Sequence, residues 1–217
     1  MNIGNIDPIA LALLLAALAL MPVILVCTTC FLKVSMVLLI VRNAIGVQQV
    51  PPGIAIHSIA LAITVLVMAP VFKEVLSALP AGDSQTDTAR LTVPDLAVAA
   101  EPLRRFMMRN TLPEQRTHIL SVARKQWPAP ASSDLHDSDY VVLVPAFVMS
   151  ELQLAFQIGF VLYVPFVVID LLISNLLLAL GMQMVSPMVI SLPMKMLLFV
   201  VLDGWAKLFD GLVRSYA

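Results

Sequence analysis

Residues 140–202 form an almost continuous apolar run in which only Glu151, Asp170 and Lys195 are expected to carry a charge. Backbone groups in such a run must be satisfied within the segment, which strongly favours helices. An isolated charge in apolar surroundings is costly, so each of the three side chains needs an opposite charge, a water-filled cavity or a neighbouring subunit. We therefore take these residues as the first candidates for function.

The composition indicates an integral membrane protein. Apolar residues make up 60% of the chain and charged residues 12%, compared with roughly half and a quarter in soluble domains. The mean hydropathy is +0.95. The net charge is −1, which gives no electrostatic reason to expect nucleic acid as a partner.

Four apolar stretches approach the roughly 20 residues that a helix needs to cross the hydrocarbon core. They comprise residues 9–32, 54–72, 140–162 and about 185–202. We expect the first to be a retained helix rather than a cleaved signal, because no Lys or Arg precedes it and it exceeds a usual signal in length.

The number of spans in the second half is open. Residues 164–180 are also apolar and are interrupted only by Pro165, Asp170, Ser174 and Asn175. This half could therefore contain two spans, three spans, or re-entrant half-helices covered by protein or water.

Basic residues suggest a topology. Lys33 and Arg42 flank the short connection 43–53, which places this connection in the cytoplasm by the positive-inside rule. We interpret both as topology anchors in preference to ligands. Residues 73–139 then lie outside the cytoplasm although they hold eight of the 13 Lys and Arg residues, because a segment this long translocates largely regardless of its charge.

The chain divides into three predicted segments: an N-terminal helical hairpin (1–72), a polar and partly helical insertion (73–139), and C-terminal hydrophobic helices (140–217). In the insertion we predict helices over 94–100, 102–109 and about 113–125, the last opened by a capping box that begins at Thr111. This segment has little apolar surface, so we expect it to pack on the other helices or on another chain.

The connection between the first two helices has two interpretations. Gly46 can end a helix in the left-handed conformation and the prolines can start the next, which describes an ordinary turn. Alternatively, the connection is a loop that binds other proteins through exposed glutamines. The candidate residues are Arg42, Asn43, Gly46, Gln48, Gln49, Pro51 and Pro52.

No residue pattern predicts an enzyme, a metal site or a cofactor. Cys27 and Cys30 have the spacing of a redox motif but lie in an apolar helix without a nearby acid or histidine. His57, His118 and His136 are scattered, and no phosphate-binding loop or zinc-protease motif is present.

Several segments of this sequence together carry a family resemblance. They are residues 42–52, 146–152, 157–160, 165–170, 190–195 and 202–205, that is RNAIGVQQVPP, AFVMSEL, QIGF, PFVVID, ISLPMK and LDGW. In these motifs the chain resembles the SctR/FliP family of type III secretion export-apparatus proteins. Residues 47–49 after the glycine, together with the missing signal peptide, resemble the injectisome branch more than the flagellar one.

This resemblance implies an all-α membrane protein that is a non-enzymatic pore subunit in the bacterial inner membrane. It implies about five copies of the chain that assemble with SctS-like and SctT-like proteins, and also with SctU-like and SctV-like proteins, into a helical export gate. Family members hold much of this assembly above the plane of the lipid bilayer, and unfolded secreted proteins pass along its axis.

Five of the 12 methionines lie close together near the C-terminus: Met182, Met184, Met188, Met194 and Met196. They could be ordinary fillers of a membrane helix, or they could form a deformable ring around a passing chain. The resemblance favours the second interpretation for Met182, Gln183 and Met184, because the gasket loop of the family falls there. The amide of Gln183 departs from a wholly apolar seal, although amides bonded to one another across subunits could still close the channel.

For the buried charges, we expect Glu151 to pair with Lys195 within one subunit or across a subunit boundary. The alternative is that each reaches water separately. Asp170 and Asp203 are expected near helix ends, in a capping or a functional role.

Two other functions remain open: a secondary transporter that uses Glu151, Asp170 and Lys195, and a passive scaffold for a larger assembly.

Overall fold

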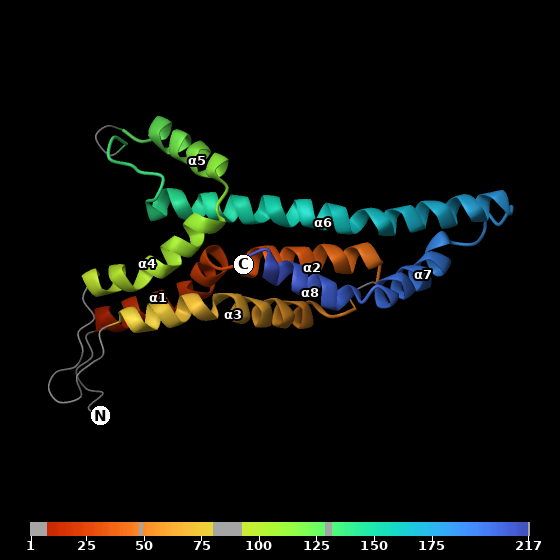
Figure 1. The fold of residues 1–217 in the computed structure, drawn as a ribbon, viewed down its shortest axis with the longest axis horizontal. Coiled ribbons are helices and arrows are strands. Elements are labelled where there is room, and N and C mark those ends of the chain that lie inside the picture. Colours follow the sequence, from red (N-terminus) through yellow and green to blue (C-terminus); the bar gives the residue numbers. More distant parts are fainter. Residues whose placement is uncertain (1–7, 48–49, 80–92, 129–131, 217) are drawn as a thin grey trace, which may run out of the picture.

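A computed structural model of the chain describes residues 8–47, 50–79, 93–128 and 132–216. Within these residues all regular structure is helical (Figure 1), which confirms the predicted all-α fold. The helices are α1 (Pro8–Thr28), α2 (Phe31–Ile45), α3 (Gly53–Ala78), α4 (Val93–Asn110), α5 (Pro113–Gln126), α6 (Tyr140–Ala179), α7 (Pro187–Val201) and α8 (Gly204–Arg214).

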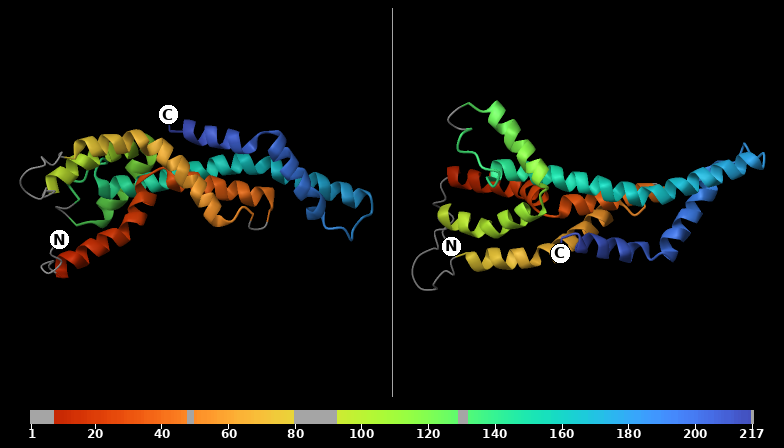
Figure 2. Two further views of the ribbon diagram at one scale, coloured as in Figure 1. Left: turned by 90° about the horizontal axis from the view of Figure 1, so that it is seen from below. Right: turned by 45° about the horizontal axis from the view of Figure 1, so that its top comes forward.

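The long helix α6 organises the molecule. Helix α2 lies along it, α4 and α5 pack on its first part, and α7 turns back from its far end (Figures 1 and 2). Helix α8 then returns toward α2 and α3, so that the end of the chain lies near the middle of the molecule. The result is an elongated shape in which the turn between α6 and α7 projects beyond all other helices.

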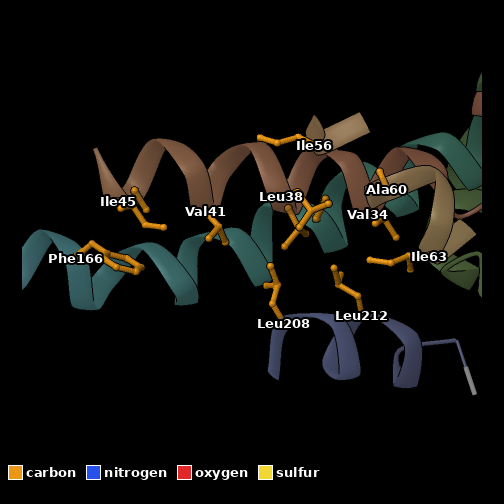
Figure 3. Close-up of a cluster of buried hydrophobic side chains, with 13 residues drawn as sticks. Val34, Leu38, Val41, Ile45, Ile56, Ala60, Ile63, Phe166, Leu208 and Leu212 are labelled. Carbon is orange, nitrogen blue, oxygen red and sulfur yellow. The ribbon is translucent and has the colours of Figure 1, made fainter. Parts of the chain in front are cut away.

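The main core lies where α2 meets α3, α6 and α8 (Figure 3). Its buried apolar side chains include Val34, Leu38, Val41, Ile56, Ala60, Ile63, Phe166, Leu208 and Leu212. Helices α2 and α6 approach closely at Gly159, where an added Cβ would lie 2.5 Å from Cδ1 of Ile40. Helix α2, which is apolar around most of its circumference, is thus enclosed by three other helices.

The first apolar stretch is not the single helix predicted over 9–32. It breaks after Thr28, and the axes of α1 and α2 differ by 71°. The hydroxyls of Thr28 and Thr29 donate to the carbonyls of Ile24 and Leu25 at 2.7 and 2.6 Å. Hydroxyl bonds of this kind compete with the backbone ladder and bend helices, which accounts for the break.

The apolar stretches 140–162 and 164–180 are not separate helices, because one helix runs through both. Helix α6 has 40 residues and continues through Pro145 and Pro165. Helices α7 and α8 are bent by 60° relative to each other. Of the described helices, α3 and α6 are long and apolar enough to cross a membrane, and the count rises to four if each bent pair is one span.

The polar insertion folds onto the long helices. Helix α4 contacts α3 and α6, and α5 contacts α6. The two short helices predicted over 94–100 and 102–109 are one helix, which continues through Pro102. The capping box is also wrong: Leu112 is the N-cap residue, and the Thr111 hydroxyl donates back to the carbonyl of Met107 at 2.6 Å. Helix α3 runs to Ala78, past the predicted end of the hairpin at residue 72.

Candidate functional site

A buried charged cluster joins α2, α6 and the end of the chain. Glu151 is 0% exposed and Lys33 only 2%, and the Lys33 Nζ lies 3.5 Å from the Glu151 Oε1. The Tyr216 hydroxyl donates to the Glu151 Oε2, while the Lys33 ammonium lies 3.5 Å from the centroid of the Tyr216 ring, in a cation–π contact. We call these three residues the Lys33 cluster.

This cluster corrects two predictions. Within the chain, Glu151 pairs with Lys33 and not with Lys195. Glu151 and Asp170 are 19 positions apart on one helix, which corresponds to about 28 Å, and Lys195 lies beside Asp170. Lys33 is also not an exposed topology anchor, because α2 turns it toward α6. A contact between Glu151 and Lys195 of different subunits stays a prediction.

A second charged pair ties α7 to α6 and α2. The Lys195 Nζ donates to the Asp170 Oδ2 at 2.6 Å and to the carbonyl of Ala44 at 3.3 Å. Ala44 lies in the last turn of α2, where carbonyls attract a positive charge. The Asp170 side chain is 46% exposed and lines a pocket of about 220 Å³ with Ser174 and Ser191. Asp170 is thus within α6, not at a helix end as predicted.

Asp203 does lie at a helix end. It precedes α8 in the left-handed conformation, with φ of 51°. Its carboxylate forms no capping hydrogen bond, and the residue is exposed. The structure therefore assigns Asp203 to the bend between α7 and α8, without a side-chain capping role.

The predicted gasket residues lie in the turn between α6 and α7, at the projecting end of the molecule (Figure 2). Met182 is 44% exposed and Met184 100% exposed, and Gln183 is also exposed. Gly181 allows the turn because its φ is 72°, a conformation that favours glycine. All three candidate side chains are free to contact another molecule.

The connection 43–53 has the predicted turn at its start. Gly46 is left-handed with φ of 83°, and its N–H donates to the carbonyl of Asn43. Pro52 precedes α3 in an extended conformation. Gln48 and Gln49 lie outside the described residues, so the interpretation as a binding loop stays a prediction, which also involves Arg42 and Pro51.

The insertion carries exposed charge pairs. The Arg104 Nε donates to the Glu101 Oε2 and the Arg104 Nη2 donates to the Glu101 Oε1, each at 2.7 Å. This hydrogen-bonded guanidinium lowers the pKa of Glu101. Arg105 pairs in the same region with Glu74 of α3 at 2.9 Å. The second pair joins α4 to α3 by a polar interaction at the surface, whereas the first lies within α4.

Within the part of the chain that the structure describes, no group of three or more His, Cys, Asp or Glu residues could hold a metal ion. Cys27 and Cys30 are free, and Cys30 is buried. The described side chains therefore offer packing surfaces and charge pairs.

Sequence reasoning missed two residues of the Lys33 cluster. Lys33 had a signal, since it interrupts an apolar helix in the same way as Glu151, Asp170 and Lys195 do. The sequence contains no signal for Tyr216, because a tyrosine near the end of a chain can equally be an ordinary exposed residue.

Comparisons with known proteins identify relatives of this chain. The model of the FliP family matches residues 14–212. The chain is 51% identical to the harpin secretion protein HrcR of Erwinia amylovora, with all of both chains covered. It is 42% identical to the Yop proteins translocation protein R of Yersinia pestis over 97% of each chain. It is also 37% identical to the virulence protein YscR of Salmonella typhimurium, covering 97% of this chain and 98% of that protein.

Proposed function

Because this chain belongs to the FliP family, we propose that it acts in type III protein secretion as a pore subunit of the export gate. Several copies, five by analogy with the family, assemble in the bacterial inner membrane with SctS-like and SctT-like proteins. Unfolded secreted proteins pass through the shared axis. The relatives named for harpin secretion and Yop translocation support the secretion role.

The single observation that carries the pore role is the position of Met184. It is fully exposed at the tip of the α6–α7 hairpin, in the turn that projects beyond the other helices at one end of the molecule. A methionine in that place has no packing role within its own chain. In a ring of subunits, the same position brings identical thioether side chains from each copy to one constriction.

The apolar surface of the hairpin also supports assembly. Side chains along the second part of α6 and along α7 are strongly exposed, among them Leu171, Leu172, Leu176, Val189, Leu197 and Val200. A continuous apolar surface of this kind requires lipid or another protein chain. Sister subunits covering it would hold the hairpin tips in a fixed relation to one another.

The chemistry of the tip suits a seal for a passing polypeptide. Methionine is unbranched and deformable, so Met182 and Met184 can adapt to side chains of different width and close again afterwards. The Gln183 amide can donate and accept, so neighbouring copies can bond to one another when no substrate is present. No covalent step is involved, and the subunit is not an enzyme in this proposal.

Crosslinking at the tip tests the proposal. In a chain with Cys27→Ala and Cys30→Ala, Met184→Cys is introduced, and the tips of neighbouring copies are joined by a short thiol crosslinker in the assembled system. Secretion of a substrate protein into the medium should stop and should recover on reduction of a cleavable crosslinker. Met188→Cys, 51% exposed on α7 outside the tip, is the matched control and should leave secretion running.

The same experiment distinguishes the alternatives. A passive scaffold would continue to secrete with its tips joined. A secondary transporter would need Glu151, Asp170 and Lys195 to bind ions or protons in exchange with water, but Glu151 and Lys195 are buried against opposite charges. No structural observation favours the transporter, and it would operate without any partner chain.

A further inference from the structure

An apolar cavity of about 370 Å³ lies between α2, α6, α7 and α8, beside the main core. Its walls are made by aliphatic and aromatic side chains of all four helices. They include Val41, Leu162, Phe166, Phe199, Leu208 and Leu212. Among the described residues, Lys207 of α8 is the one charged residue that lines this cavity.

The size of the cavity restricts its occupant. Small-molecule sites span roughly 300–1,000 Å³, so the cavity of about 370 Å³ is at the small end. A single hydrocarbon chain is slender enough to lie in a space of this size.

Charge at the cavity favours an anionic headgroup. Lys207 is exposed and forms no ion pair among the described residues. Asp203 and Asp210 of the same region do not line the cavity, and Asp210 is occupied by Arg214 at 2.9 Å. Lys207 thus offers an uncompensated positive charge directly beside apolar walls.

Helix α8 itself has the composition of a helix at a membrane surface. Leu208 and Leu212 are buried, while Trp205 and Phe209 are 42% and 41% exposed. Tryptophan and lysine are enriched where hydrocarbon meets headgroups, and amphipathic helices with such residues lie in that plane. This environment would supply both the hydrocarbon and the negative charge that the cavity accepts.

We propose that this cavity binds one acyl chain of an anionic phospholipid, with the headgroup phosphate paired to Lys207. The acyl chain fills the space between Phe166, Phe199 and Leu212. Its apolar contacts with these side chains stabilise the bound lipid in proportion to the area buried. The bound acyl chain then packs against α7 and α8 and stabilises the bend between these two helices. The site depends on membrane residence alone and does not require the pore role.

The test uses the full chain, co-expressed with its secretion partners and reconstituted into phosphatidylcholine vesicles. The probe is a trace of phosphatidylglycerol with a photoactivatable diazirine on one acyl chain. After illumination, mass spectrometry of peptides should find the adduct on cavity residues of α7 and α8. The same probe with a phosphatidylcholine headgroup should label these residues about fivefold less, the contribution of one lysine near an anionic lipid.

Two variants test the two parts of the site. Lys207→Gln should reduce phosphatidylglycerol labelling about fivefold, to the phosphatidylcholine level. Gly211 lines the cavity, and an added Cβ would meet no atom within 4 Å, so Gly211→Leu should fill the space and abolish labelling by both probes. Gly53→Leu is the matched control, since Gly53 also has open space around it but does not line the cavity.

Circular dichroism and thermal unfolding establish that each variant is folded. Absence of adducts on cavity residues in the unmodified chain would overturn the proposal, as would undiminished labelling in Gly211→Leu. Equal labelling by both probes, unchanged in Lys207→Gln, would overturn the assignment to an anionic lipid. Adducts confined to residues outside the cavity would leave the cavity to a protein partner and would equally contradict the proposal.

Discussion

The two parts of α6 bury charge in opposite ways. Near its beginning, Glu151 is 0% exposed and is enclosed by Lys33 and Tyr216 of the same chain. Near its end, the Asp170 side chain is 46% exposed although Lys195 contacts it. The first part is also covered by α1, α2, α4 and α5, whereas α7 and the end of α2 lie beside the second.

This difference indicates which part of the fold one chain can complete. The Lys33 cluster and the core around α2 contain their own partners, so they define the structure of the single chain. In the α6–α7 hairpin many apolar side chains are exposed and the Asp170 side chain is about half exposed. Lipid or another protein chain must therefore cover this surface. Substitutions in the enclosed part should therefore reduce stability, and those in the hairpin should mainly affect assembly.

The largest loss of stability is expected from Lys33→Met, which leaves the buried Glu151 carboxylate without its cation. Breaking a buried pair in this way costs about 3–5 kcal/mol. Urea unfolding in mild detergent, followed by circular dichroism, measures the free energy. The double variant Lys33→Met with Glu151→Gln should recover at least half of the loss, because the amide oxygen can still accept from the Tyr216 hydroxyl. A loss below about 1 kcal/mol in the single variant would contradict a buried pair.

A smaller effect is expected where α2 and α6 are closest. Gly159→Leu places a side chain against Ile40 and should destabilise the chain by about 1–3 kcal/mol, as overpacking does. The same unfolding measurement applies. Ile40→Ala should compensate in part, and Gly53→Leu should cause much less change because open space surrounds Gly53. Equal losses in both leucine variants would show that the effect is not local.

At the open end, Lys195→Gln should cost only about 1–2 kcal/mol. It removes a charged hydrogen bond to Asp170 and one to Ala44, but Asp170 can turn to water. A loss as large as that of Lys33→Met would remove the contrast between the two parts of α6. Exchanging Glu151 and Lys195 should restore nothing within one chain, so recovery of secretion by the exchange would reveal a contact between subunits.

The smallest effect is expected at the surface of the insertion. Arg104 lowers the pKa of Glu101 below its ordinary value of 4.5, so the stabilisation is present above that pH and is lost as the pH falls through the lowered value. Glu101→Gln should cost roughly 0.2–0.5 kcal/mol at pH 7. Thermal unfolding at pH 7 and at about pH 3 should show this difference shrinking. A difference that grows on acidification would contradict the pairing.

The sequence predicted the helices better than it predicted their ends and contacts. The apolar runs correctly indicated an all-α chain, and Gly46 correctly indicated a turn after α2. The break at Thr28 was missed because a hydroxyl can bend a helix or simply point outward, and the sequence alone does not distinguish the two. Pro165 suggested an interruption, but α6 continues through it, as helices in membranes often do.

The charged pairs could not be assigned because pairing depends on the packing of helices distant in sequence. Glu151 and Lys195 were matched as the opposite charges of one apolar region, which ignored Lys33 in an earlier helix. The rule that a buried charge needs a partner was right for both residues, whereas the pairing predicted within one chain was wrong and the pairing between chains stays a prediction. The exposed tip at Met182 and Met184 was placed by family resemblance, and no periodicity in the sequence could have supplied it.

The length of α6 has one more consequence. Its 40 residues rise about 60 Å, twice the roughly 30 Å of hydrocarbon in a bilayer. To fit inside, the rod would have to lean by about 60°, beyond the tilts of about 0–40° that such helices adopt. Part of this apolar helix must therefore lie outside the lipid, where the other helices of its own chain or those of other proteins shield it from water.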